Sequence, residues 1–266
     1  MVSKSRIVDQ QADQDSDSHV FAELFNQDYL DFYKEELDDE TNDEEAATIA
    51  ELLHLQPGLK ILDLPCGHGR IARRLAAMGA IVTGVDRSEL FLKHARQDAR
   101  QHDIAIDYRL ADMRTLSSSN EFDVVLNWFT SFGYFDDETL QALLKRMHQA
   151  LVPGGRLVLE TMNLHRQTLQ SEESSNTKIL TDEAGTHFLI DRSYYDPHDG
   201  RLHTRRFITR SGEATRMTPY QLRLFGLTEL KNWLHAAGFA NVQAFGANAE
   251  VFRCDSDRLI VVAQRP

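Results

Sequence analysis

Two short apolar runs in this chain each end in an aspartate, and glycines follow the first of them. The first run ends at Asp63 and leads to Gly67 and Gly69, and the second run ends at Asp86. In an open α/β sheet, such strand ends lie side by side at the edge where ligands bind. Glycine lets the backbone approach a ligand closely, and an aspartate accepts two hydrogen bonds from a ribose diol. The spacing predicts a site for a nucleoside-containing cofactor.

The glycine pattern separates the common nucleotide sites. A dinucleotide site needs G-x-G-x-x-G, but the corresponding positions here are Pro65, Gly67 and Arg70,. A P-loop is excluded because no G-K-[ST] follows. The remaining pattern, D-x-x-x-G-x-G, resembles the first motif of class I S-adenosylmethionine-dependent methyltransferases of the bacterial small-molecule type. Pro65 stands where that family has its first glycine, and it should stiffen the turn because proline fixes φ.

Further motifs extend this resemblance over residues 29–266. Asp112 and Met113 match the family's third motif, in which the acid accepts the adenine amino group and the next residue covers the ring. The segment 129–135 resembles the loop of amino-sugar N,N-dimethyltransferases and glycine N-methyltransferase-like enzymes. Some of those relatives carry a histidine at the position of Tyr134, so the resemblance brings no histidine base to that position.

The resemblance implies a set of residues that contact S-adenosylmethionine: Tyr29, Tyr33, Asp63, Pro65, Cys66, Gly67, Gly69, Arg70, Asp86, Arg87, Ala111, Asp112, Met113, Asn127, Trp128 and Phe129. The candidate catalytic residues are Tyr33, Tyr134 and His203, and the candidate substrate contacts are Ser131, Tyr134, Tyr220 and Arg223. No metal site is expected. Structural alternatives stay open: Asp112 would also serve as a helix cap, Tyr29 and Tyr33 as core, and His203 as a surface residue.

The elements that would hold these residues alternate between strand and helix. The alternation predicts a doubly wound, Rossmann-like α/β fold with a seven-stranded, mostly parallel sheet. Strands are expected at 60–64, 80–86, 106–110, 122–127 and 156–162, and near 241–245 and 258–263. Residues 19–33 have the spacing of one amphipathic helix. Ser88, and Asp136 or Asp137, are expected to cap helices.

Between Asn163 and Gln221 the alternation stops. Residues 187–195 and 201–210 alternate in a β fashion around a turn at 196–200,. We expect an antiparallel hairpin or small sheet here, inserted after strand five as a lid over the substrate. The predicted organisation is a disordered acidic tail at 1–18, a helical cap at 19–56, the cofactor domain at 57–163 and 221–266, and the lid at 164–220.

The charge is distributed unevenly along the 266 residues. Residues 1–45 hold fifteen of the 41 acidic side chains and three of the 29 basic ones, which leaves 26 of each for the rest. A neutral body behind an acidic front argues against a nucleic-acid partner, which favours a basic track. No membrane span or signal peptide is evident, and the two cysteines suit a reducing cytoplasm,. A monomer or homodimer that acts on a small molecule is expected.

The sequence therefore predicts an S-adenosylmethionine-dependent methyltransferase that methylates a nitrogen, or an oxygen, of a small-molecule acceptor and leaves S-adenosylhomocysteine. Two alternatives stay open: an O-methyltransferase of a phenol or carboxylate, and a protein that binds S-adenosylmethionine without catalysis.

Overall fold

The computed structural model describes residues 19–168 and 173–266, so the tail predicted at 1–18 lies outside the described residues. Residues 19–24 are helical. The further helices are α2 (Gln27–Phe32), α3 (Asp39–Leu53), α4 (Arg70–Ala77), α5 (Glu89–Gln101), α6 (Asp137–Ala150), α7 (Leu164–Thr168) and α8 (Leu227–Ala236), with short 3-10 turns η1 (Met113–Thr115), η2 (Ser131–Tyr134) and η3 (Ala247–Ala249). The strands are β1 (Lys60–Asp63), β2 (Ile81–Asp86), β3 (Asp107–Leu110), β4 (Phe122–Asn127), β5 (Leu151–Met162), β6 (Ser174–Asp182), β7 (Gly185–Asp196), β8 (Arg201–Thr209), β9 (Arg216–Arg223), β10 (Ala240–Phe245) and β11 (Arg258–Gln264).

Seven strands form the central sheet in the order β10-β11-β5-β4-β1-β2-β3. The pairs among β1 to β5 are parallel, and β11 runs antiparallel to both β5 and β10. The predicted fold class is confirmed, including the antiparallel insertion after strand five. The predicted helix caps at Ser88 and Asp136 are confirmed too, since each side chain accepts a backbone N–H in the first turn of its helix.

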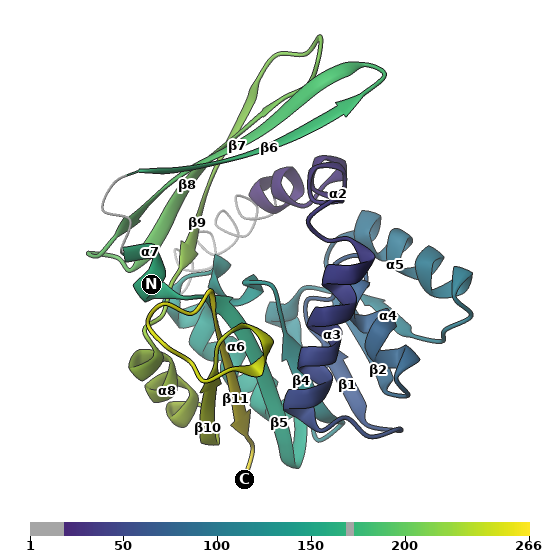
Figure 1. The fold of residues 1–266 in the computed structure, drawn as a ribbon. Helices are drawn as coiled ribbons and strands as arrows, with labels where there is room; N and C mark the ends of the chain where they lie inside the picture. Colours follow the sequence, from purple (N-terminus) through teal and green to yellow (C-terminus); the bar gives the residue numbers. More distant parts are fainter. Residues whose placement is uncertain (1–18, 169–172) are drawn as a thin grey trace, which may run out of the picture.

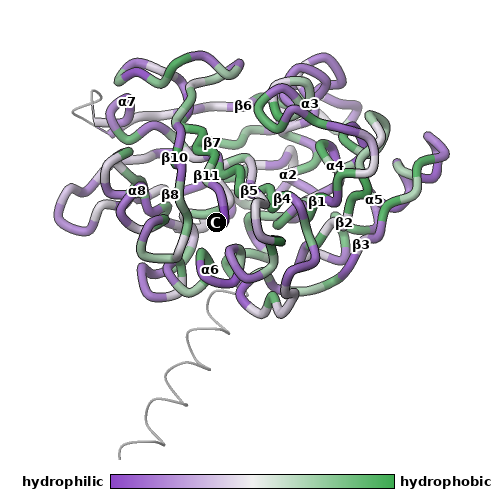
Figure 2. Tube along the Cα trace, turned by 90° about the horizontal axis from the view of Figure 1, so that it is seen from below, coloured by the Kyte–Doolittle hydropathy of each residue, from purple (hydrophilic) through white to green (hydrophobic). Residues whose placement is uncertain are grey.

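Alternate residues of the central strands face opposite hydrophobic layers. Ile61 and Val124 pack with α3, α4 and α5, whereas Leu62 and Val125 pack with α6 and α8. Figure 2 shows these hydrophobic strands in the middle of the molecule, with hydrophilic segments around them. Each fully buried aliphatic side chain of this kind stabilises the fold by about 1.5–3 kcal/mol. None of the described helices has the length and apolarity that a membrane span requires.

The N-terminal segment differs from the prediction, because residues 19–33 form two helices rather than one. Asn26 has an extended backbone, and its side chain accepts the N–H of Asp28 at 2.9 Å, so a new helix begins there. Apolar spacing alone does not reveal this, since asparagine favours caps over helix interiors through such local bonds. The break directs α2 across the carboxyl ends of the central strands (Figure 1).

The insertion is larger than a hairpin. Strands β6, β7, β8 and β9 form a four-stranded antiparallel sheet, here called the lid sheet, which lies over the body with α2 beside it (Figure 1). The prediction missed β6 and β9 because their inward positions are largely polar, so the usual alternation is weak,. Pro219 in β9 is tolerated because β9 is an edge strand of this sheet,.

Strand β5 begins at Leu151 rather than at Arg156, and its register with β4 shifts between Phe122 and Val124. Gly154, with a φ of +82°, and Gly155, where an added Cβ would lie 3.0 Å from the Asp123 carbonyl oxygen, accommodate this irregularity. The division of the chain into cap, cofactor domain and lid stays a prediction.

Candidate active site

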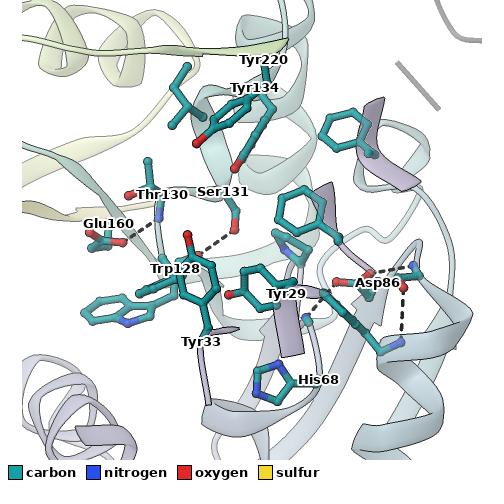
Figure 3. Close-up of a pocket in the computed structure, with 18 of the residues that line it drawn as sticks. Tyr29, Tyr33, His68, Asp86, Trp128, Thr130, Ser131, Tyr134, Glu160 and Tyr220 are labelled. Atoms are coloured by element: carbon teal, nitrogen blue, oxygen red, sulfur yellow. Dashed lines mark hydrogen bonds between the residues drawn. The ribbon is translucent and has the colours of Figure 1, made fainter. Parts of the chain in front are cut away.

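A cavity of about 890 Å³ lies where the body, α2 and the lid sheet meet. Its walls come from the ends of β1, β2 and β4, from α2, and from the inner face of the lid sheet (Figure 3). Ligand pockets typically measure about 300–1,000 Å³, so this cavity lies near the upper end of that range. The cavity has two halves: the cofactor half lies beside the glycine turn, and the acceptor half lies beneath the lid sheet.

The glycine turn is fastened to the end of β2. The buried carboxylate of Asp86 accepts the N–H of Gly67 and the N–H of Ser88, both at 2.8 Å. Gly69 has a φ of +81°, and a Cβ there would lie 2.4 Å from the hydroxyl of Tyr108. Gly69 does not line the cavity, so its role is to let the turn close rather than to touch a ligand. Pro65 and Cys66 do line it, and the Leu64–Pro65 bond is cis.

Asp63 is the feature of the cofactor half that best fits a cationic ligand. Its side chain lines the cavity and is 2% exposed, yet no hydrogen bond from the described residues reaches its carboxyl group. Burial raises its pKa to about 8, with a further contribution from Asp86 that opposes the effect of Arg70. A buried carboxyl without a partner is unfavourable unless a ligand supplies one. A cationic group of a ligand would supply such a partner.

Asp112 combines the two roles that the sequence left open. It lines the cavity beside Ala111 and Met113, and it caps η1 by accepting the N–H of Arg114 at 2.8 Å. The Arg114 guanidinium also donates to the carboxylate at 2.8 Å, and Arg87 lies 3.8 Å away. Burial alone would raise the pKa of Asp112, but these arginines hold it below its ordinary value.

The segment after β4 is strained. Phe129 and Thr130 have φ values of 59° and 57°, in the left-handed region that non-glycine residues rarely adopt. Such residues cost of order 1–3 kcal/mol each and persist only where the surroundings hold them. Both line the cavity, together with Trp128 and Ser131. Ser131 donates its hydroxyl to the Trp128 carbonyl at 2.8 Å (Figure 3).

Arg70 and Glu45 anchor this strained segment. Glu45 accepts from Arg70 Nη1 at 2.5 Å and from Trp128 Nε1 at 2.9 Å. Burial opposes ionisation of Glu45, but Arg70 and Arg258 lower its pKa below the ordinary value. The guanidinium of Arg70 lies 4.7 Å from the ring centroid of Phe129. Sequence reasoning placed Arg70 at the cofactor but gave no sign of Glu45, which comes from α3, a helix outside the motifs.

An aromatic wall joins the two halves. The rings of Tyr29 and Tyr33 stack at a centroid distance of 4.5 Å, and Phe25 contacts Tyr134 edge-on at 5.5 Å. Burial raises the pKa of Tyr29, of Tyr33 and of Tyr134, so all three remain neutral phenols at pH 7. His68 lies next to Tyr29, and burial, helped by Arg70, lowers its pKa to about 4. It is therefore a neutral imidazole at pH 7.

The acceptor half has a polar roof. Arg206 donates to Asp191 from Nε at 2.8 Å and from Nη2 at 2.7 Å, and Nη2 also reaches the hydroxyl of Tyr33 at 3.0 Å. The ring of Tyr220 stacks beside that of Tyr134 at 6.2 Å (Figure 3). Several polar residues of the lid sheet that the sequence did not single out also line this half: Ser174, Ser175, Asn176, Asp191, Ser193, Thr204 and Arg206. Their only sequence signal is a β-like alternation whose inward positions are polar.

Besides Gly69, three predicted site residues do not line the cavity: Asn127, His203 and Arg223. His203 lies on the outer face of the lid sheet, where it stacks on Tyr194 and bonds to Asp199 at 2.7 Å. The structure therefore does not bring His203, predicted to be catalytic, to the cavity, because neighbouring strand residues point to opposite faces,. With Asp196 and Asp199 it forms a partly exposed group whose nitrogen and oxygen atoms lie within 4.8 Å of one another.

Arg223 and Asn127 also serve the fold rather than the cavity. Arg223 pairs with Asp137 at 3.3 Å and with Glu229, so it joins the lid sheet to α6 and α8. Arg223, predicted to contact the substrate, does not line the cavity, and its charge is paired with both acids. Asn127 is fully buried and donates to the Leu64 carbonyl at 2.6 Å, which ties the end of β4 to the end of β1.

Comparisons with known proteins agree with this geometry. Residues 61–155 match the family described as "Methyltransferase domain". A "Ubiquinone biosynthesis O-methyltransferase" of Ruegeria pomeroyi is 37% identical over 107 residues, which are 40% of this chain and 42% of that protein. The chain thus spans about two fifths of the length of the curated relatives it matches.

Two solved structures share the fold over most of the chain. The CcbJ methyltransferase from Streptomyces caelestis has 23% identity and a TM-score of 0.71, and covers 85% of this chain and 95% of its own. CalS10 from Micromonospora echinaspora, an amino pentose methyltransferase with bound S-adenosylmethionine, has 21% identity and a TM-score of 0.65, and covers 85% and 92%. Residues 61–155 are therefore similar to a methyltransferase domain, and most of the chain shares the fold of these two methyltransferases.

Proposed function

We propose that this protein is an S-adenosylmethionine-dependent methyltransferase that transfers a methyl group to a nitrogen of a small polar acceptor. The observation that carries the proposal is the unpartnered, buried carboxyl of Asp63 beside the fastened glycine turn, in a cavity whose other half is polar. One half suits a cationic nucleoside and the other has separate room for an acceptor.

Residues of the cofactor half have complementary roles in this proposal. When bound, S-adenosylmethionine supplies a methyl group on a positively charged sulfur. Asp63 would hold the ammonium group, Asp86 the ribose diol, and Asp112 with Met113 the adenine. Tyr29, Tyr33 and Tyr134 would cover the reacting centre, exclude water and place neutral aromatic faces near the positive charge. Because the donor is already activated, positioning supplies most of the catalysis.

The acid–base chemistry of the acceptor half supports nitrogen over oxygen. A hydroxyl acceptor needs a base, whereas a neutral amine brings its own lone pair. Burial raises the pKa of Tyr33, of Tyr134 and of Tyr220, and neutral phenols are poor bases at pH 7. The sequence had put Tyr33 and Tyr134 forward as catalytic; here they orient the acceptor by hydrogen bonds.

The polarity of the roof supports a polar acceptor. In this roof the hydroxyls of Ser193 and Thr204 share one hydrogen bond at 2.8 Å, and Asp191 pairs with Arg206. A long apolar acceptor would remove water from the remaining hydrogen-bonding atoms of these four side chains and offer them no partner. Each unsatisfied polar group costs roughly 1–3 kcal/mol, and charged groups cost more. An acceptor with its own hydroxyl or amino groups replaces those lost bonds.

Calorimetric titration tests the donor assignment first. We expect micromolar binding of S-adenosylmethionine and S-adenosylhomocysteine and no binding of NADH, used as a control for any adenine nucleoside. A screen of small hydroxylated amines, matched with the corresponding alcohols, would then measure methyl transfer by the release of S-adenosylhomocysteine. Failure to bind either sulfur nucleoside would reject the proposal. Transfer to alcohols alone would reject the choice of nitrogen.

A further inference from the structure

Glu160 lies at the carboxyl end of β5, and its side chain is 2% exposed. Its Oε2 accepts the backbone N–H of Thr130 at 2.8 Å, as the dashed line in Figure 3 shows. Its Oε1 lies 4.0 Å from Nε of Arg258. Glu160 also lines the cavity, although it belongs to none of the sequence motifs.

Thr130 is one of the two strained residues after β4. Nothing in the sequence indicates that a side chain of the neighbouring strand β5 would bind its N–H. Its N–H cannot join a regular strand because Phe129 and Thr130 both turn into the left-handed region. The carboxylate of Glu160 provides the acceptor that the neighbouring strand's backbone does not. A buried N–H with no acceptor would make the strained turn still less favourable.

The same turn is held from its other side by charges. The ring of Phe129 has the guanidinium of Arg70 4.7 Å from its centroid and that of Arg258 at 5.5 Å. Arg258 Nη1 lies 2.8 Å from Oε1 of Glu45, which also binds Arg70. Residues from α3, α4, β5 and β11 therefore surround this single turn.

We propose that Glu160 is a positioning residue that fixes the strained turn 128–131, so that Trp128 and Ser131 are held at the junction of the cofactor and acceptor halves. The consequence for methyl transfer rests on the proposed function. The positioning itself is a property of the chain without ligand.

Three substitutions separate the hydrogen bond from the charge. E160Q keeps an oxygen at the same reach and loses the charge. E160D keeps the charge but is one methylene shorter, and E160A loses both. The chain has two tryptophans, so a W233F background leaves Trp128 as the sole fluorescent reporter. Trp233 lies on α8, packs against Phe225 and does not line the cavity.

We expect the emission maximum of Trp128 in ligand-free W233F/E160Q to match that of W233F. In W233F/E160D and W233F/E160A it should shift to longer wavelength as the turn loosens. Binding of S-adenosylhomocysteine should change less than about 5-fold in all three. Methyl transfer to an acceptor found in the screen should fall about 10- to 100-fold in E160D and E160A, the range for a lost hydrogen bond to a charged group. E160Q should retain most of the rate.

Other outcomes overturn the proposal. Unchanged Trp128 emission in both E160D and E160A would show that the turn needs no support from Glu160. A rate loss in E160Q equal to that in E160A, with loss of one limb of the pH–rate profile, would make Glu160 an acid–base group instead. If E160A fails to fold, the E160D and E160Q pair still decides. If W233F binds no S-adenosylhomocysteine, the proposed function fails, while the ligand-free emission still tests the positioning.

Discussion

The cofactor half of the cavity takes its polar side chains from the ends of neighbouring strands: Asp63 from β1, Asp86 from β2 and Asp112 just after β3. The acceptor half takes its side chains from α2, η2 and all four strands of the lid sheet, which are far apart in sequence. The first arrangement follows from strand order alone. The second exists only once the lid sheet has been folded over the body.

The two halves also differ in how their charges are compensated. Asp63 has no hydrogen-bond partner among the described residues, whereas Asp191 and Arg206 form a bidentate pair. A carboxyl left without a partner prepares a site for a charged ligand, and a paired one contributes polarity without net charge. In the proposed function, the cofactor half therefore recognises charge, and the acceptor half recognises shape and hydrogen-bonding groups.

The largest expected effect is the loss of cofactor binding in D86A. Two charge-assisted hydrogen bonds to a ribose are worth about 3–6 kcal/mol together, so the dissociation constant for S-adenosylhomocysteine should rise at least 100-fold. Calorimetry measures it, with circular dichroism to verify folding because Asp86 also holds the glycine turn. D86N, which keeps one side-chain oxygen as an acceptor but loses the charge, is the matched control and should lose less. Equal affinity in D86A and the parent protein would contradict the assignment.

A large effect of a different kind is expected for R206A. Removing this arginine leaves Asp191 with a buried charge, which should lower the free energy of unfolding by about 3–5 kcal/mol. Binding of S-adenosylhomocysteine, measured at a temperature where the variant is folded, should stay within about 3-fold. R206M/D191L, which removes both charges, should recover much of the stability. Loss of cofactor binding in R206A would show that the two halves are not independent.

A smaller effect is a pH dependence from Asp63. Its pKa of about 8 means that it is mostly protonated at pH 7. Binding an ammonium group requires the ionised form, so binding should release a proton, and affinity should weaken by up to about 10-fold per pH unit below pH 8. Calorimetry in buffers of different ionisation enthalpy measures the proton count. D63N should show no proton release, and a parent protein that releases none would refute the assignment.

The stability of the ligand-free protein tests the same group. Because the pKa of Asp63 is raised above its ordinary value of 3.8, the folded protein binds more protons than the unfolded chain between about pH 4 and pH 8,. The contribution of Asp63 to the free energy of unfolding is therefore complete below that window and is lost as the pH rises through it. D63N should remove this dependence and stabilise the protein at pH 8.

The smallest effect is expected for H203A, which changes the outer face of the lid sheet beside the cavity-facing Leu202 and Thr204. Cofactor affinity and methyl transfer should change less than 2-fold, since His203 bonds only to an exposed acid and stacks on Tyr194. A 10-fold fall in the transfer rate would mean that the outer face takes part in acceptor binding.

Local pattern was sufficient for the central sheet and for most of the cofactor half. The alternation of strand and helix predicted the fold class, and Asp63 and Asp86 were found from their positions at strand ends. Gly67 was found from the glycine turn, and Asp112 from its resemblance to a family motif. The break at Asn26 was missed because a side-chain cap competes with apolar spacing. The structure places His203 and Arg223 away from the cavity, because residue type does not tell which face a strand presents or which acids lie nearby.

The sequence by itself determined the parallel sheet and the residues at its carboxyl edge, because hydrophobic periodicity and glycine act through neighbours along the chain. Only the tertiary structure decided which acids and arginines pair. Asp28 on α2 binds Arg210 and Arg216 of the lid segment, and Glu45 joins Arg70 to Arg258 across the body. Such pairs depend on burial and on distances between segments up to about two hundred residues apart. For the same reason Glu160, Asp191 and Arg206 could be assigned to the cavity only after the chain had folded.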